Sequence, residues 1–137
     1  MKVFLDTNIF IRFFVPEDEI VHASVRSLLD QVQQGVLIPY TSSVVLLECS
    51  YVLQKNYGFP SVRVQDALDR IVAMRNMTIK ETTNIKKALS FWRKTAVKFT
   101  DCLIATQVPD GVTFVTYDRD FAKLPVRAKT PKQILAS

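Results

Sequence analysis

The sequence predicts an α/β fold, a three-layer sandwich in which helices cover both faces of a mostly parallel central sheet. Short apolar segments alternate along the chain with longer amphipathic segments, which is the pattern of such folds. The 137 residues suit a single domain, expected over residues 1–137. A hydrophobic share of 48% excludes wholesale disorder, and the longest aliphatic run, Val44 to Leu47, is too short to span a membrane.

The first elements follow from capping residues and apolar spacing. Lys2–Leu5 is an apolar, β-prone segment, and Asp6-Thr7-Asn8 after it is typical of a helix N-terminus. Acids at its start and apolar residues spaced by three, four and seven predict an amphipathic helix between Glu17 and Gly35. A second strand is expected over residues 36–38, with Pro39 stopping it.

Caps, breakers and turn residues also divide the rest of the chain. A proline or glycine separates most of the apolar segments, and a good capping residue precedes most of the helical ones. In order we expect a helix from Ser42 or Ser43 to about Asn56, a helix from Pro60 to about Asn76, a strand over 77–80, a helix capped by Asn84, a helix over 101–108 capped by Thr100, a turn at 109–111, a strand over 112–116 and a turn or short helix over 117–121.

Charge and cysteine content point to an anionic partner and a reducing compartment. The formal net charge is +5, but residues 1–79 carry −1 and residues 80–137 carry +6, which favours nucleic acid as a partner. Cys49 and Cys102 each lie in a hydrophobic segment and are expected to be free, buried thiols. The first apolar segment is interrupted at Asp6 before a signal peptide forms, so we expect a cytoplasmic protein.

Four acidic residues occupy places that acids normally avoid. Asp6 and Asp118 directly follow predicted strands, so both are expected at the carboxyl edge of the sheet, where ligands bind in α/β folds. Glu48 lies among apolar helical neighbours with no cation at i±4, and Asp101 begins an almost wholly apolar helix. Each also has a purely structural explanation: a helix cap, a turn residue, a favourable helix dipole or a distant ion pair.

The alternative is that these four carboxylates converge on one pocket. Two unit charges about 4 Å apart repel by about 4 kcal/mol at an effective dielectric of 20, so an acidic pocket calls for a cation. All-oxygen ligation suits Mg²⁺ or Mn²⁺. Zinc is disfavoured because His22 is the only histidine and the two cysteines show no ligand spacing.

The sequence resembles the PIN-domain nucleases, and among them the VapC-type toxins of prokaryotic toxin–antitoxin pairs. The ordered combination of matching segments covers nearly the whole chain: residues 3–8, Ser43 through Glu48, residues 98–105 and residues 114–121. The resemblance implies a metal-dependent endoribonuclease that leaves a 5′-phosphate and a 3′-hydroxyl. It also implies a homodimer and an antitoxin partner, which often inserts a basic side chain into the acidic pocket.

Site residues carry over from this resemblance position by position. The family's acidic quartet, which holds one or two Mg²⁺ or Mn²⁺ ions, corresponds to Asp6, Glu48, Asp101 and Asp118. Three polar residues match those that orient the acids, and one further acid matches a residue that acts through a water: Thr7, Asn8 and Thr116, and Asp120.

Other functions fit the residues less well or stay open. A haloacid-dehalogenase-type phosphatase needs an aspartate where Asn8 stands. A phosphorelay receiver needs one at the end of a middle strand, and residues 77–80 contain none. A catalytically silent binding module and a housekeeping RNA-processing nuclease remain as alternatives.

Overall fold

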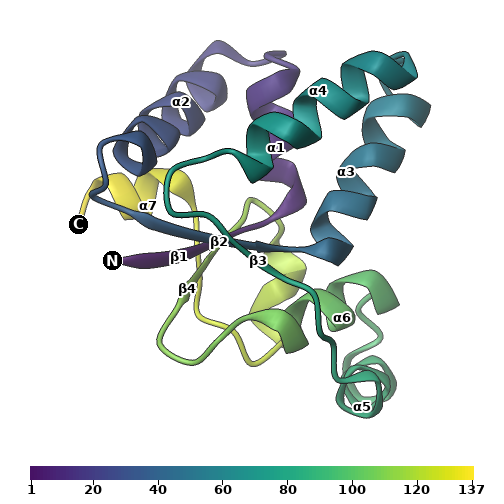
Figure 1. Ribbon diagram of the computed structural model, residues 1–137. Coiled ribbons are helices and arrows are strands. Elements are labelled where there is room, and N and C mark those ends of the chain that lie inside the picture. The colour runs from purple at the N-terminus through teal and green to yellow at the C-terminus, as the bar shows by residue number, and fades with distance from the viewer.

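The fold is a five-stranded, all-parallel sheet with helices packed on both faces, as the sequence predicts (Figure 1). The computed structural model describes residues 1–137. The strands are β1 (Lys2–Leu5), β2 (Ile38–Ser42), β3 (Thr78–Lys80), β4 (Thr113–Val115) and β5 (Ala128–Lys129). The helices are α1 (Thr7–Phe14), α2 (Glu19–Gln33), α3 (Ser43–Lys55), α4 (Ser61–Val72), α5 (Ile85–Thr95), α6 (Phe99–Gln107), the 3₁₀ helix η1 (Arg119–Lys123) and α7 (Pro131–Leu135).

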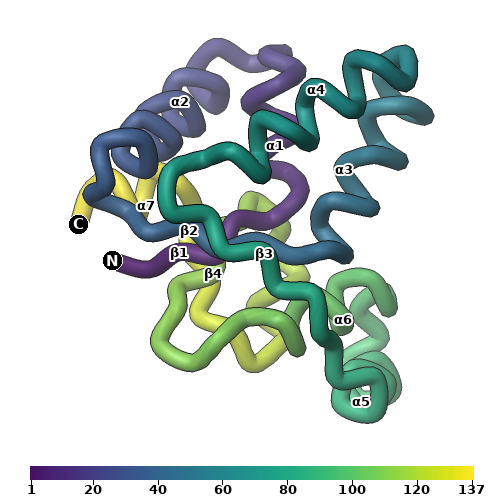
Figure 2. The backbone as a smooth tube through the Cα atoms, viewed as in Figure 1, coloured from purple at the N-terminus to yellow at the C-terminus, as the bar shows by residue number.

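The strand order β3-β2-β1-β4-β5 places β1 in the centre of the sheet. The chain builds outward from β1 through β2 to β3, and then returns through α5 and α6 to place β4 on the other side of β1 (Figure 2). The strand order therefore reverses between β1 and β4. In open α/β sheets this switch point opens a crevice at the carboxyl ends of the strands, which is where ligands bind.

The hydrophobic core lies between the sheet and its helices. The residues of β1 that follow Lys2 are fully buried. One of them, Phe4, packs in the core with two other phenylalanines. Phe4 stacks on Phe114 at 5.6 Å between ring centroids, and Phe114 contacts Phe121 of η1 at 4.4 Å. This packing fixes the ends of β1 and β4, from which Asp6 and Asp118 project.

The structure corrects the expected position of the second strand. Pro39 does not stop it, because β2 runs from Ile38 to Ser42 and Pro39 is in register with Val3. The amide of Ile38 donates to Met1, so the missing N–H of Pro39 faces the opposite side. On that side β3 begins to pair only at Tyr40, so the proline removes no ladder hydrogen bond.

Two helix boundaries also differ from expectation. The helix expected after Thr100 begins at Phe99 with Lys98 as its N-cap, because the amides of Asp101 and Cys102 donate to the Lys98 carbonyl. The helix that starts after Pro60 ends at Val72 rather than near residue 76, where Asn76 has a left-handed φ of 59° that an α-helix does not contain.

The last two elements, β5 and α7, lie beyond the final element that the sequence predicts. β5 pairs with β4, and α7 packs on α2 after a complete capping box formed by Thr130 and Gln133. The two cysteines are free and buried, as expected. No helix has the length and apolar character needed to cross a bilayer.

Candidate active site

The four carboxylates that the sequence singles out line one open hollow of about 220 Å³. Asp6 follows β1 and Asp118 follows β4, while Glu48 comes from the middle of α3 and Asp101 from the first turn of α6. Four segments far apart in sequence thus deliver one carboxylate each to the switch point of the sheet. The four acids therefore share one acidic hollow in addition to the capping or ion-pairing contacts that individual members make. The remaining residues around the hollow are Thr7, Asn8, Ile11, Arg12, Val52, Tyr57 and Lys98.

The Asp6 side chain accepts more hydrogen bonds than any of the other three acids. It caps α1 through a 2.8 Å hydrogen bond from the Thr7 amide to Oδ1, so the expected capping role is real. Its Oδ2 accepts hydrogen bonds from Thr116 Oγ1 at 2.7 Å and Asn8 Nδ2 at 3.2 Å. Burial above all, together with the charges of Glu48 and Asp118, raises the pKa of Asp6 to about 6 although these hydrogen bonds lower it.

Thr116 and Asn8 join the ends of β1 and β4 into one network. The Thr116 hydroxyl oxygen accepts from Asn8 Nδ2 and from the Asp118 amide, both at 3.0 Å. Asn8 Oδ1 in turn accepts from the Tyr117 amide at 3.1 Å. A hydroxyl and an amide therefore set the distance between the backbones that carry Asp6 and Asp118.

The suggested fifth acid is not part of the hollow. Asp120 lies exposed at the start of η1, and its backbone amide donates to Asp118 Oδ1 at 2.9 Å. This bond orients the Asp118 carboxylate, so the contact comes from the main chain of Asp120 and not from its side chain.

Glu48 and Asp101 share a lysine. Lys98 Nζ lies 3.4 Å from Glu48 Oε2 and 3.9 Å from Asp101 Oδ1, and these are the only two ion pairs in the structure. Glu48 thus finds the distant cation that its own helix lacks, while its other oxygen accepts a hydrogen bond from the hydroxyl of Thr7. The Lys98 side chain remains 61% exposed, so its ammonium group lies at the mouth of the hollow.

Asp101 is buried and only partly satisfied. Its side chain is 3% exposed, and its Oδ2 has no hydrogen-bond partner. Burial raises the pKa of Asp101 to about 7, with Lys98 lowering it and the three other carboxylates raising it. A buried carboxylate oxygen without a partner is costly, which leaves this oxygen available to a ligand.

The donor set of the hollow fits a hard divalent cation. Every candidate ligand is a carboxylate oxygen, the preference of Mg²⁺ and Mn²⁺, and Asp101 Oδ2 is a buried oxygen with no hydrogen-bond partner. As the side chains stand, no group of three or more His, Cys, Asp or Glu residues has the spacing to hold an ion. The Lys98 ammonium group instead neutralises two of the carboxylates.

Two residues at the hollow had little signal in the sequence. Arg12 was only one of several basic residues, and Tyr57 follows α3 in a turn that no apolar pattern marks. Both line the hollow because α1 and α3 pack together, which depends on the tertiary structure.

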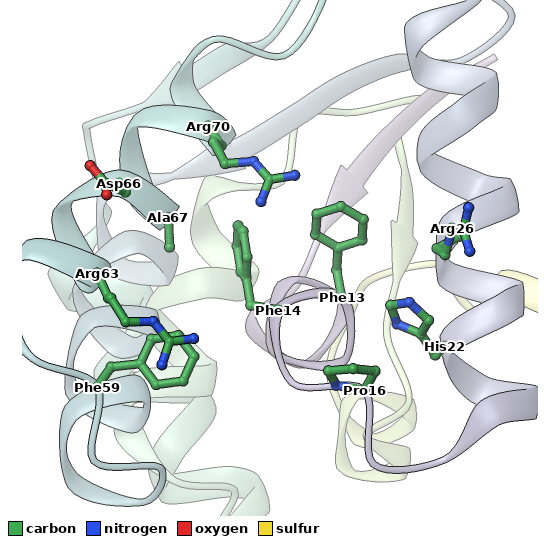
Figure 3. A pocket seen from close by; sticks show the side chains of 10 residues that line it. All are labelled: Phe13, Phe14, Pro16, His22, Arg26, Phe59, Arg63, Asp66, Ala67 and Arg70. Carbon is green, nitrogen blue, oxygen red and sulfur yellow. The ribbon is translucent and has the colours of Figure 1, made fainter.

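A second, larger hollow of about 460 Å³ lies between α2 and α4, over the C-terminal end of α1 (Figure 3). Arg63 stacks on Phe59 at 3.8 Å, and Arg70 points toward Phe13 and Phe14 in its centre. Its lining holds three arginines, Arg26 among them, against one carboxylate, Asp66, and no ion pair forms between them, so the hollow is aromatic and carries excess positive charge.

Comparisons with known proteins agree with this architecture. VapBC2 from Rickettsia felis, solved with a promoter DNA fragment, is 19% identical and superposes with a TM-score of 0.67 over 95% of this chain and 98% of that one. DNA-bound VapBC from Salmonella typhimurium is 20% identical, with a TM-score of 0.70 over 96% and 98%. A toxin–antitoxin complex from Klebsiella pneumoniae is 18% identical, with a TM-score of 0.62 over 94% and 97%.

No curated protein matches the sequence. The PIN domain family, however, matches residues 3–126, a span that contains all four carboxylates and nearly the whole sheet. The match agrees with the all-parallel sheet flanked by helices. The chain belongs to the PIN domain family.

Proposed function

We propose that this protein is a Mg²⁺- or Mn²⁺-dependent endoribonuclease, the toxin of a type II toxin–antitoxin pair, that cuts structured RNA by phosphodiester hydrolysis. The observation that carries the proposal is the meeting of Asp6, Glu48, Asp101 and Asp118 in one hollow, with a buried Asp101 oxygen left without a partner. Membership of the PIN domain family supports nuclease chemistry, and the likeness to toxin–antitoxin complexes supports the toxin role.

Each carboxylate has a role in this proposal. Asp6, Asp101 and Asp118 hold the ion or ions, and Glu48 completes the set or orients the attacking water. A bound divalent ion lowers the pKa of that water and neutralises charge on the scissile phosphate.

The neighbouring polar residues keep the acids in position. Thr116 and Asn8 hold Asp6 against Asp118, and Thr7 holds Glu48. Asp120 orients Asp118 through its backbone amide, and its exposed side chain, outside the hollow, acts through a water. Basic residues of the C-terminal half attract the RNA backbone, with Arg119 directly beside Asp118 in the chain.

We also propose an antitoxin partner, a homodimer and a cytoplasmic location. The aromatic, cationic hollow between α2 and α4 supports a protein partner, because unpaired arginines over phenylalanine rings suit a segment with acidic and apolar side chains. The exposed apolar side chains of α3 and α4, Leu47, Tyr51 and Val62 among them, support a dimer surface.

Cleavage of labelled RNA in Mg²⁺ tests the enzyme. The parent protein and the control Asp110→Asn, an exposed acid in a turn, should cleave, and EDTA should abolish the reaction. Asp6→Asn and Asp101→Asn should lower the rate by at least about 100-fold, since ligated metal supplies several kcal/mol to the barrier. If both variants fold and cleave as fast as the parent, the site assignment is wrong. Growth arrest on expression separates a toxin from an RNA-processing nuclease.

A further inference from the structure

Lys98 is the one side chain that contacts two carboxylates of the hollow at once. Its ammonium group lies 3.4 Å from Glu48 Oε2 and 3.9 Å from Asp101 Oδ1. No other ion pair exists in the structure, so no competing acid holds Lys98 and no other cation serves these two. The lysine therefore supplies, from within the chain, positive charge at the place where the acids need it.

We propose that Lys98 is the counter-ion of the metal-free site and that a divalent cation binds by displacing its ammonium group from Glu48 and Asp101. The inference rests on the proposed function, because it concerns the same carboxylates. An ion that takes oxygens of Glu48 or Asp101 as ligands comes close to this ammonium group, and like charges at such range repel. Lys98 therefore opposes metal binding while it stabilises the metal-free protein.

The position of Lys98 in the fold allows it to leave. It is the N-cap of α6, and its side chain makes no capping bond that would hold it there. Its side chain is 61% exposed, so the ammonium group reaches water without any movement of the backbone. The Asp101 carboxylate is buried and cannot swing into water in this way. When a metal replaces the lysine, the carboxylate ligands therefore stay in place and only the flexible Lys98 side chain moves.

Burial and charge at the site agree with this exchange. A lysine side chain ordinarily carries its charge at neutral pH, as a counter-ion must, and the Lys98 ammonium group faces two carboxylates at 3.4 and 3.9 Å. The Asp101 oxygen that Lys98 does not contact, Oδ2, is the one left without a partner, so the lysine satisfies the site only in part.

Titration of Mn²⁺ into Lys98→Gln and Lys94→Gln, followed by calorimetry, tests the inference. Lys94 is an exposed lysine of α5, so its variant carries the same change in net charge without touching the hollow. We expect Lys98→Gln to bind Mn²⁺ at least about fivefold more tightly than Lys94→Gln, the effect of losing one partly exposed ionic contact. Lys98→Arg keeps the charge and should bind as the parent does.

A second readout is the thermal midpoint in EDTA. Lys98→Gln should unfold at a lower temperature than Lys94→Gln in EDTA, and added Mn²⁺ should reverse that order. Equal Mn²⁺ affinities for the two glutamine variants would overturn the inference, and weaker binding by Lys98→Gln would show that the lysine instead supports the ligands. If the parent protein itself binds no Mn²⁺, the proposed function fails along with the inference.

Discussion

Replacing Asp101 with asparagine should stabilise the metal-free protein while destroying its activity. Asp101 is buried, and burial raises its pKa to about 7 from an ordinary value of 3.8. The folded protein therefore holds a proton on Asp101 up to about pH 7, whereas the unfolded chain releases it near pH 4. Because the folded state binds more protons in this window, the free energy of unfolding falls as pH rises through it.

The difference between these two pKa values lowers the free energy of unfolding at pH 8 by about 4 kcal/mol. This penalty already includes the favourable charge of Lys98, and Asp101→Asn removes it. An asparagine oxygen or amide left unpaired costs about 1 kcal/mol. We therefore expect a net gain of about 3 kcal/mol at pH 8 and no gain near pH 4.

Urea unfolding in EDTA at pH 8 and at pH 5 measures this effect, with Asp110→Asn as the matched control. Asp110 is an exposed acid in the turn before β4, so its replacement should leave the pH dependence unchanged. The parent should be less stable at pH 8 than at pH 5, and Asp101→Asn should remove much of that difference. An Asp101→Asn protein no more stable than the parent at pH 8 would refute the reasoning from burial.

Three further substitutions test the packing that supports the site. Thr116→Val removes the 2.7 Å hydrogen bond to Asp6 and should weaken Mn²⁺ binding by at least about tenfold in calorimetry; unchanged affinity would mean that Thr116 does not hold the carboxylate. Ser42→Ala removes the side-chain cap on the Val45 amide and should lower the free energy of unfolding by about 1 kcal/mol in urea, whereas a loss below about 0.3 kcal/mol would contradict the capping role. Phe121→Ala empties a fully buried site and should cost about 3 to 5 kcal/mol, which an unchanged thermal midpoint would exclude.

Local chemistry was enough to predict most of the fold. Capping residues such as Asp6, Ser42 and Asn84 stand at the helix starts where the structure has them, because a side-chain oxygen satisfies amides only a few residues away. The exceptions depend on long-range pairing. Whether Pro39 breaks a strand is decided by which neighbour its missing N–H faces, and β5 forms only because β4 offers it an edge.

The meeting of the acidic residues at one edge of the sheet could be predicted from the sequence, but their ion pairs and hydrogen bonds could not. Asp6 and Asp118 follow strands, and parallel strands deliver such residues to one edge, so their meeting follows from local patterns. The pairing of Glu48 with Lys98, fifty residues away, depends on how α3 packs against the start of α6. Asp101 Oδ2 likewise lacks a hydrogen-bond partner only because the folded chain buries it.

The most direct test of the metal site is a crystal of the protein grown with Mn²⁺ and measured for anomalous scattering. We expect anomalous density in the hollow, at about 2.0 to 2.2 Å from oxygens of Asp6, Asp101 and Asp118, with the Lys98 ammonium group moved away from Glu48. Well-ordered carboxylates with no anomalous density among them at millimolar Mn²⁺, and Lys98 still bridging Glu48 and Asp101, would contradict the proposed metal site.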